Sequence, residues 1–171
     1  MYAPLPTNVL EKTLARVRHL DESTQGENAQ DVADAIRDIV QDHAGVFRTQ
    51  ALLDEGVRQI LAIEPRVRNI HLKDKSKVFN TARVEALEVE NLYEVAKATL
   101  ISAAARKECR GAHTVVDYEL PPDHEDYPYG RRDDEWMKHT LWYSSDNRLE
   151  YKPVRYKPLT VEAIEPKPRT F

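Results

Sequence analysis

The sequence predicts a mainly α protein, in which an antiparallel helical bundle is followed by an irregular C-terminal tail with a short β-hairpin. Three observations favour this fold class. Apolar residues recur at helical spacing through the first part of the chain, the stretch from Thr81 to about Lys107 contains neither glycine nor proline, and most of the ten prolines lie after Gly111. We therefore expect a helical bundle over residues 1–112, and a loop, a hairpin and an extended tail over residues 113–171.

Side chains that can cap a helix precede four stretches of helical periodicity. The predicted N-cap residues are Asn8, Asn28, Thr49 and Asn80. Asn8 and Glu11 have the form of a capping box, which predicts a first helix over about 8–19. Gly45 is expected to end the second helix, and Pro65, which lacks a backbone donor, is expected to end or kink the third. The predicted buried stripes are Leu10, Leu14 and Val17, then Val32, Ile36, Ile39 and Val40, then Leu52, Leu53, Val57, Ile60 and Leu61.

The fourth helix is expected to be the longest element. It begins at Thr81, and at 1.5 Å per residue it forms a rod of about 40 Å. Its predicted apolar stripe is Val84, Leu87, Leu92, Val95, Leu100 and Ile101. Such a rod needs neighbours to cover its apolar face, and the three shorter helices supply them. Residues 67–78, which precede it, are expected to form an extended connector.

The sequence changes character after Gly111. Prolines and acidic residues are frequent over 114–135, which predicts an irregular loop. Residues 139–143 and 148–154 are two short strand-like runs, and the polar residues 144–147 between them predict a hairpin turn. Trp136, Trp142 and Tyr143 are the expected packing aromatics. The proline-containing end of the chain is expected to be extended and to pack on the bundle or on another domain.

Composition excludes several classes of protein. The 25 basic and 29 acidic side chains are interspersed, so there is no basic stripe for a nucleic-acid partner. No run approaches the ~18 apolar residues that span a bilayer, so we expect no direct membrane insertion. The five glycines are widely separated, which excludes a self-contained dinucleotide-binding domain with its Gly-rich turn. One cysteine cannot form an internal disulfide.

A group of potential metal ligands lies in the predicted loop. Its members are Asp117, Glu119, Asp123, His124, Glu125 and Asp126. Their spacing matches no known metal-binding loop, and two prolines interrupt them. We interpret the group as a solvated acidic loop and predict no metal ligand.

Arg106, Arg110 and His113 are spaced i, i+4 and i+7, so they share one face as long as the helix continues. Two interpretations remain open: cations near a helix C-terminus that Gly111 caps, or a contact with carboxylates on another domain. Cys109 lies among the same charges, which could lower the pKa of its thiol. A nucleophile would also need a base, and only closeness in sequence supports His113 for that role. We therefore predict no catalytic residue.

Six short segments carry a resemblance to a known family. They are Gly-Val-Phe-Arg-Thr (45–49), Lys-Ser-Lys-Val-Phe-Asn-Thr (75–81), Arg-Lys-Glu-Cys-Arg-Gly-Ala-His (106–113), Arg-Asp-Asp-Glu-Trp-Met-Lys-His-Thr (132–140), Arg-Leu-Glu-Tyr (148–151) and Pro-Arg-Thr-Phe (168–171). In this order they resemble the C-terminal part of the flavoprotein subunit of succinate dehydrogenase and fumarate reductase. That family has serine in place of Cys109, which argues against a required thiol.

The resemblance implies a spectrin-repeat-like bundle from an oxidoreductase that transfers a hydride equivalent between succinate or fumarate and FAD. The family's FAD-binding, flavin-linking and dicarboxylate-binding motifs match nothing here. His139 in Lys-His-Thr is not a flavin attachment site, because the family's Ser-His-Thr segment lies near the start of the subunit. We expect a structural, non-catalytic chain that itself holds no cofactor, with Arg106, Arg110 and His113 as the interdomain contact.

The resemblance also implies partners and a location. The expected partners are the flavin-binding domain of the same subunit and the iron–sulfur subunit, and the expected location is cytoplasmic, peripheral on the inner face of a bacterial membrane. Within this resemblance, the sequence of residues 136–143 favours a bacterial respiratory succinate dehydrogenase. Three alternatives remain: a fumarate reductase domain, a freestanding helical interaction module, and, weakest, an enzyme that uses the Cys109 region.

Overall fold

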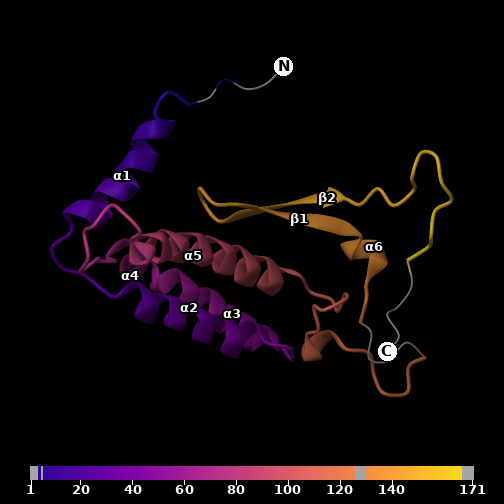
Figure 1. Ribbon diagram of the computed structural model, residues 1–171. Helices are drawn as coiled ribbons and strands as arrows, with labels where there is room; N and C mark the ends of the chain where they lie inside the picture. The colour runs from indigo at the N-terminus through magenta and orange to yellow at the C-terminus, as the bar shows by residue number, and fades with distance from the viewer. Residues whose placement is uncertain (1–3, 5, 126–129, 167–171) are drawn as a thin grey trace.

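The computed structural model describes residues 4, 6–125 and 130–166. Helices α2 (Ala29–Ala44), α3 (Gln50–Ala62) and α5 (Thr81–Ala105) pack against one another and form the bundle (Figure 1). The predicted fold class, a helical bundle followed by an irregular tail with a hairpin, is confirmed. Within the described ranges, no helix combines the length and the apolar character that crossing a membrane requires.

Side-chain caps begin the three bundle helices, as predicted. The Asn28 carboxamide oxygen accepts a hydrogen bond from the N–H of Gln30 at 2.8 Å. Thr49 Oγ1 accepts from the N–H of Leu52 at 3.2 Å, and Asn80 Oδ1 accepts from the N–H of Arg83 at 3.0 Å. Each bond satisfies a backbone donor that the first turn of a helix leaves without a partner.

The two predicted stops are also confirmed. α2 ends at Ala44 with Gly45 as its C-cap, and α3 ends just before Pro65. The short helix α4 (Glu64–Arg68) then begins with this proline in its first turn, where a missing N–H costs nothing. α4 occupies the start of the predicted extended connector, and the rest of the connector contains only an isolated bridge between Ile70 and Glu27.

The first helix forms, but it does not cover the bundle. α1 (Val9–Glu22) projects away from the other helices (Figure 1). The predicted capping box at Asn8 is wrong, because this side chain makes no cap hydrogen bond. The predicted buried stripe is also wrong, since Leu10 and Leu14 are exposed and only Leu20 is buried. Periodicity identified an apolar face correctly, but it does not specify what packs on that face.

α5 buries a different face from the predicted one. Its buried residues are Ala86, Val89, Tyr93, Ala96, Lys97, Leu100 and Ala103. Of the predicted stripe, Leu100 is fully buried, Leu87 and Leu92 pack at the edge of the core, and Val84 and Val95 are exposed. Apolar side chains occur all around this helix, so several faces fit a helical period. The face that is buried is rich in alanine, which lets α2 and α3 approach closely.

Close packing inside the bundle depends on Gly56 of α3. A Cβ atom at this position would lie 2.6 Å from the Cβ of His43 and 2.8 Å from a methyl carbon of Leu100. Both distances are shorter than a carbon–carbon contact allows. The absence of a side chain at Gly56 therefore sets the spacing of the three bundle helices.

The predicted hairpin is confirmed and lies beside α5. Strands β1 (Lys138–Tyr143) and β2 (Arg148–Pro153) pair antiparallel over their whole length, with the turn at 144–147. The ammonium group of the buried Lys97 lies 5.5 Å from the centre of the Trp142 ring. This cation–π contact joins the hairpin to the long helix.

In the described residues between α5 and the hairpin, 106–125 and 130–137, the chain is irregular except for two short helices, a 3-10 helix at Val116–Tyr118 and α6 (Asp133–Trp136). The predicted loop was therefore broadly correct but missed these turns. Trp136 is buried and meets the Tyr151 ring edge to face, with ring centres 5.8 Å apart. After the hairpin, residues 154–166 form no helix or strand. Asp126 of the acidic loop and the resemblance segment 168–171 lie outside the described residues.

Candidate functional site at the end of the long helix

The three residues predicted to form an interdomain contact lie where α5 ends. The helix stops at Ala105, and Arg106 is its C-cap with extended backbone angles (φ −90°, ψ 104°). Arg110 and His113 therefore lie in a loop, so the condition under which all three would share one helical face, a helix that continues to His113, is not met. Tertiary packing overrides helix propensity here, because the loop carries the fully buried Val115 into the core.

A tight turn brings Arg110 and His113 together. The N–H of Arg110 donates to the carbonyl of His113 at 2.8 Å, and the N–H of His113 donates back at 3.0 Å. Gly111 has a φ of +57°, in the left-handed region that side chains disfavour. Gly111 thus forms this turn, and the prediction that it caps the long helix is wrong.

Glu108 organises this region, and the sequence analysis missed it. Its side chain is 0% exposed and accepts hydrogen bonds from Arg106 Nη1, from Arg110 Nε at 2.7 Å and from Arg110 Nη2 at 3.0 Å. A further bond of 3.0 Å comes from the backbone N–H of Arg132. Residues two apart lie on the same side of an extended segment. The spacing of Arg106, Glu108 and Arg110 is the signal that could have found it.

Asp133 extends this ion-pair network to the start of α6. Its carboxylate lies 2.7 Å from Arg110 Nη2 and 2.9 Å from Arg131 Nη2. Arg106 also donates to two backbone carbonyls next to β1. The side chains of Arg106 and Arg110, 16% and 28% exposed, thus tie the end of α5 to the start of the hairpin. The residues Arg106, Glu108, Arg110, His113 and Asp133 are called the junction cluster below.

His113 is held as a neutral imidazole. Its Nδ1 lies 3.0 Å from Arg48 Nη1, and its Nε2 lies 3.0 Å from the carbonyl oxygen of Arg106. A guanidinium can only donate, so Nδ1 accepts, and the proton sits on Nε2 and is donated to the carbonyl. Burial lowers the pKa of His113, and the positive charges of Arg48 and Arg106 lower it further.

Cys109 has the properties of a structural cysteine. It is buried, and its Sγ lies 3.3 Å from the carbonyl oxygen and 3.4 Å from the amide nitrogen of Val115. Burial raises the pKa of the Cys109 thiol, so the lowering that the neighbouring basic residues could have caused does not prevail. A thiol with a raised pKa carries little thiolate at neutral pH and is a weak nucleophile.

An open hollow of about 450 Å³ lies beside the junction cluster. It is lined by Ser102, Ala103, Arg106, Arg110, His113, Lys138, His139, Thr140 and Val154. Arg106, Arg110 and Lys138 contribute basic side chains to this lining, which contains no carboxylate. The two guanidinium groups already pair with Glu108, and Arg110 also pairs with Asp133. The position of His139 on β1 agrees with its predicted place in the hairpin. The hollow is suited to an anionic group such as a carboxylate.

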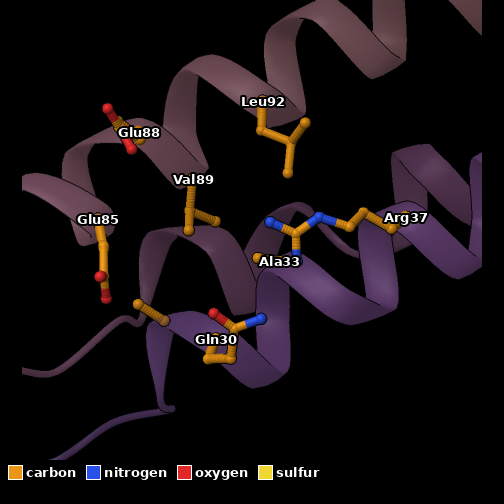
Figure 2. A pocket seen from close by; sticks show the side chains of 8 residues that line it. Gln30, Ala33, Arg37, Glu85, Glu88, Val89 and Leu92 are labelled. Atoms are coloured by element: carbon orange, nitrogen blue, oxygen red, sulfur yellow. The ribbon is translucent and has the colours of Figure 1, made fainter. Parts of the chain in front are cut away.

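A second, smaller groove of about 240 Å³ runs between α2 and α5 (Figure 2). Arg37 extends into it from α2, while Glu85 and Glu88 lie on α5 toward its other end (Figure 2). Arg37 already pairs with Asp34 at 2.6 Å. The lining of this groove offers opposite charges and alkyl groups but no nucleophile and no imidazole.

The described part of the chain offers an ion-pair network that joins the end of α5 to the hairpin, and a hollow that can bind an anion. No described group of three or more His, Cys, Asp and Glu side chains is placed to hold a metal ion. In the predicted acidic loop, Asp117 accepts a hydrogen bond of 2.7 Å from the N–H of Gln50 at the start of α3. The thiol of Cys109 and the imidazole of His113 are both engaged with backbone groups.

Comparisons with known proteins agree with the resemblance that the sequence carries. Residues 33–171 match the family model described as fumarate reductase flavoprotein C-term. The succinate dehydrogenase flavoprotein subunit of Rickettsia bellii is 39% identical over 99% of this chain and 28% of its own length. The corresponding subunit of Rickettsia conorii is 46% identical over 77% of this chain and 21% of its own length.

A solved structure of Escherichia coli quinol fumarate reductase has a similar fold, with a TM-score of 0.72 and 28% identity. The similarity covers 95% of this chain and 27% of that one. The chain therefore spans about a quarter of the proteins that it matches. It belongs to the family of C-terminal domains of succinate dehydrogenase and fumarate reductase flavoproteins.

Proposed function

We propose that the chain is the C-terminal structural domain of a succinate dehydrogenase subunit and supports the FAD- and dicarboxylate-binding domain during electron transfer from succinate. One observation carries this proposal: nearly the whole chain aligns with 28% of the length of a succinate dehydrogenase flavoprotein subunit. On this account the chain alone holds no FAD and is not catalytic. The groups that bind FAD and dicarboxylate belong to the rest of the subunit.

The partners follow from this placement. They are the flavin-binding domain of the same subunit and the iron–sulfur subunit, with no nucleic acid and no inserted helix. The complex would lie in the cytoplasm, peripheral on the inner face of the bacterial membrane. The exposed tail supports a partner outside the chain: Leu159, Val161 and Ile164 are apolar and exposed. We propose that this tail packs on the flavin-binding domain.

The junction cluster is the proposed interdomain contact, with Arg106, Arg110 and His113 as its main residues. The cationic hollow beside them supports this role, because it can receive a carboxylate from the other domain. The internal bonds of the three residues assign them a second task, which is to hold the walls of the hollow in place. Ion pairs of this kind specify geometry even where they add little net stability.

The test of the proposed function is association. The chain is mixed with a separately expressed flavin-binding domain, and the complex is measured by sedimentation velocity. A one-to-one complex is expected, and two folded components that sediment independently would refute the proposal. For the contact residues, Arg110→Ala in the complete subunit should reduce flavin incorporation or assembly. Unchanged flavin content, assembly and turnover would remove Arg110 from the contact.

A further inference from the structure

Two large apolar side chains protrude from the loop between α2 and α3. Val46 is 75% exposed and Phe47 is 77% exposed. Extensive apolar patches mark interaction sites. This pair adjoins a hollow, whereas exposure alone does not distinguish it from Val78 and Phe79, which are 73% and 101% exposed. Residues 45–48, with these two at their centre, are called the Phe47 loop below.

The Phe47 loop borders an open hollow of about 490 Å³. The hollow is lined by Gln41, Ala44, Gly45, Val46, Arg48, Gly111, Ala112 and Thr114. Small and apolar groups predominate, and Arg48 is the only charged residue in this lining, although 32% of the chain is charged. The loop and the hollow together present a projection beside a depression, a shape that fits an apolar partner surface.

This surface is fixed before any partner binds. Arg48 Nε donates to the carbonyl of Gly45 at 2.8 Å, and Arg48 Nη1 donates to His113 at 3.0 Å. The carbonyl of Arg48 accepts a bond of 2.8 Å from the N–H of Val116. The Phe47 loop is thus attached to the segment that carries the Gly111 turn. A rigid loop loses little conformational entropy on docking, which favours tight association.

We propose that the Phe47 loop and the adjoining hollow dock onto the flavin-binding domain of the same subunit, with the Phe47 ring buried in that contact. This inference rests on the proposed function. Two observations select this occupant. First, the Arg48–His113 bond makes the loop continuous with the junction cluster, the proposed interdomain contact. Second, the chain matches only 28% of the length of a succinate dehydrogenase flavoprotein subunit, so most of such a subunit lies outside this chain and can cover the loop.

The chain offers a matched control in a second Val-Phe pair. Phe79 is fully exposed and lies just before the N-terminus of α5. The Phe47 loop lies near the C-terminal end of α5, where Arg48 donates a hydrogen bond to His113. The two phenylalanines thus have equal chemistry and similar exposure but belong to opposite ends of the bundle. A contact through the Phe47 loop leaves Phe79 in solvent.

The test measures thiol labelling of Phe47→Cys and Phe79→Cys by a maleimide, with peptide mass spectrometry as the readout. In the isolated chain both introduced thiols should react at the rate of a free thiol. In the complete subunit, purified without the iron–sulfur subunit, labelling of Phe47→Cys should slow at least about tenfold, while Phe79→Cys should not change. Equal labelling of Phe47→Cys in both preparations overturns the inference.

Other outcomes separate this inference from the proposed function. Protection of Phe79→Cys alone places the contact at the other end of the bundle and overturns the inference. Protection of Phe47→Cys that occurs only after the iron–sulfur subunit is added overturns it as well. If the chain associates with the flavin-binding domain but Phe47→Ser binds as tightly as the wild type, the inference fails and the proposed function stands. We expect Phe47→Ser to weaken binding by about tenfold or more.

Discussion

Replacement of Glu108 by glutamine tests whether one buried carboxylate holds the end of the bundle together. Glu108→Gln keeps the size of the side chain but removes the charge that faces Arg106 and Arg110. Breaking a fully buried ion pair costs about 3–5 kcal/mol. The two arginine side chains are 16% and 28% exposed, so water can partly solvate them, and we expect the lower end, about 3 kcal/mol.

The free energy of unfolding is measured by urea denaturation of the chain, followed by far-ultraviolet circular dichroism. Glu55→Gln is the matched control, because Glu55 pairs with Arg58 at the surface, where ion pairs contribute little. The chain also contains an internal probe. Cys109 is its only cysteine and is buried, so thiol labelling under native conditions reports local opening of the junction.

We expect labelling of Cys109 to accelerate by about a hundredfold in Glu108→Gln, which corresponds to about 3 kcal/mol of local stability. A loss of less than about 1 kcal/mol in urea, together with unchanged labelling, would refute the reasoning. Glu108 would then be a buried acid without an organising role. A large labelling effect with a small global effect would instead place the cluster in a separately opening unit.

Three further predictions concern the bundle and the junction. Gly56→Ala should destabilise the chain by about 1 kcal/mol or more, because the clash with the His43 Cβ outweighs the gain in helix propensity; a stabilised variant would contradict this. Because burial lowers the pKa of His113 in the folded state, the unfolded state binds more protons, and the free energy of unfolding should fall as the pH drops below about 6.5. Urea denaturation of His113→Gln at several pH values should show a smaller dependence of this free energy on pH, and an unchanged dependence would contradict a neutral, buried His113. Thr49→Ala should cost about 1 kcal/mol in the same assay through loss of the α3 cap, and no change would show that the cap is not needed.

Local chemistry made much of the fold predictable from the sequence. The caps at Asn28, Thr49 and Asn80 depend on a side chain and a backbone N–H two or three residues away. Gly45 and Pro65 act at their own positions in the chain. Signals of this range are contained in the sequence itself, and all five were predicted correctly.

One local signal failed, because Asn8 makes no cap hydrogen bond. The other errors in the helices concern which partner covers a face. α1 has the predicted helix but leaves Leu10 and Leu14 exposed, because periodicity gives a face without its neighbour. On α5, apolar residues on all sides made Val84 and Val95 as suitable as the alanines that are buried. Tertiary contacts decided both cases, and they are not encoded in local spacing.

The closeness of the three proposed contact residues was predicted, their organising carboxylate was missed, and their interdomain role stays a prediction. Arg106, Arg110 and His113 do lie together, but the assumption of a continuing helix hid Glu108 between them. After the helix ends at Ala105, the following loop buries Glu108, Cys109 and Val115, and Glu108 bonds to Arg132, far along the chain. Charge pairs at a spacing of two residues become a signal only once the segment is known to be extended.

The central claim is that this chain supports a flavin-binding domain, and recovery of activity tests it most directly. Succinate oxidation by the separately expressed flavin-binding domain, loaded with FAD, is measured while the chain is titrated in. The account predicts that turnover rises and saturates at one chain per flavin, and that Phe47→Ser requires about tenfold more chain than Phe79→Ser. Turnover that is independent of added chain, with both components folded, would contradict the account.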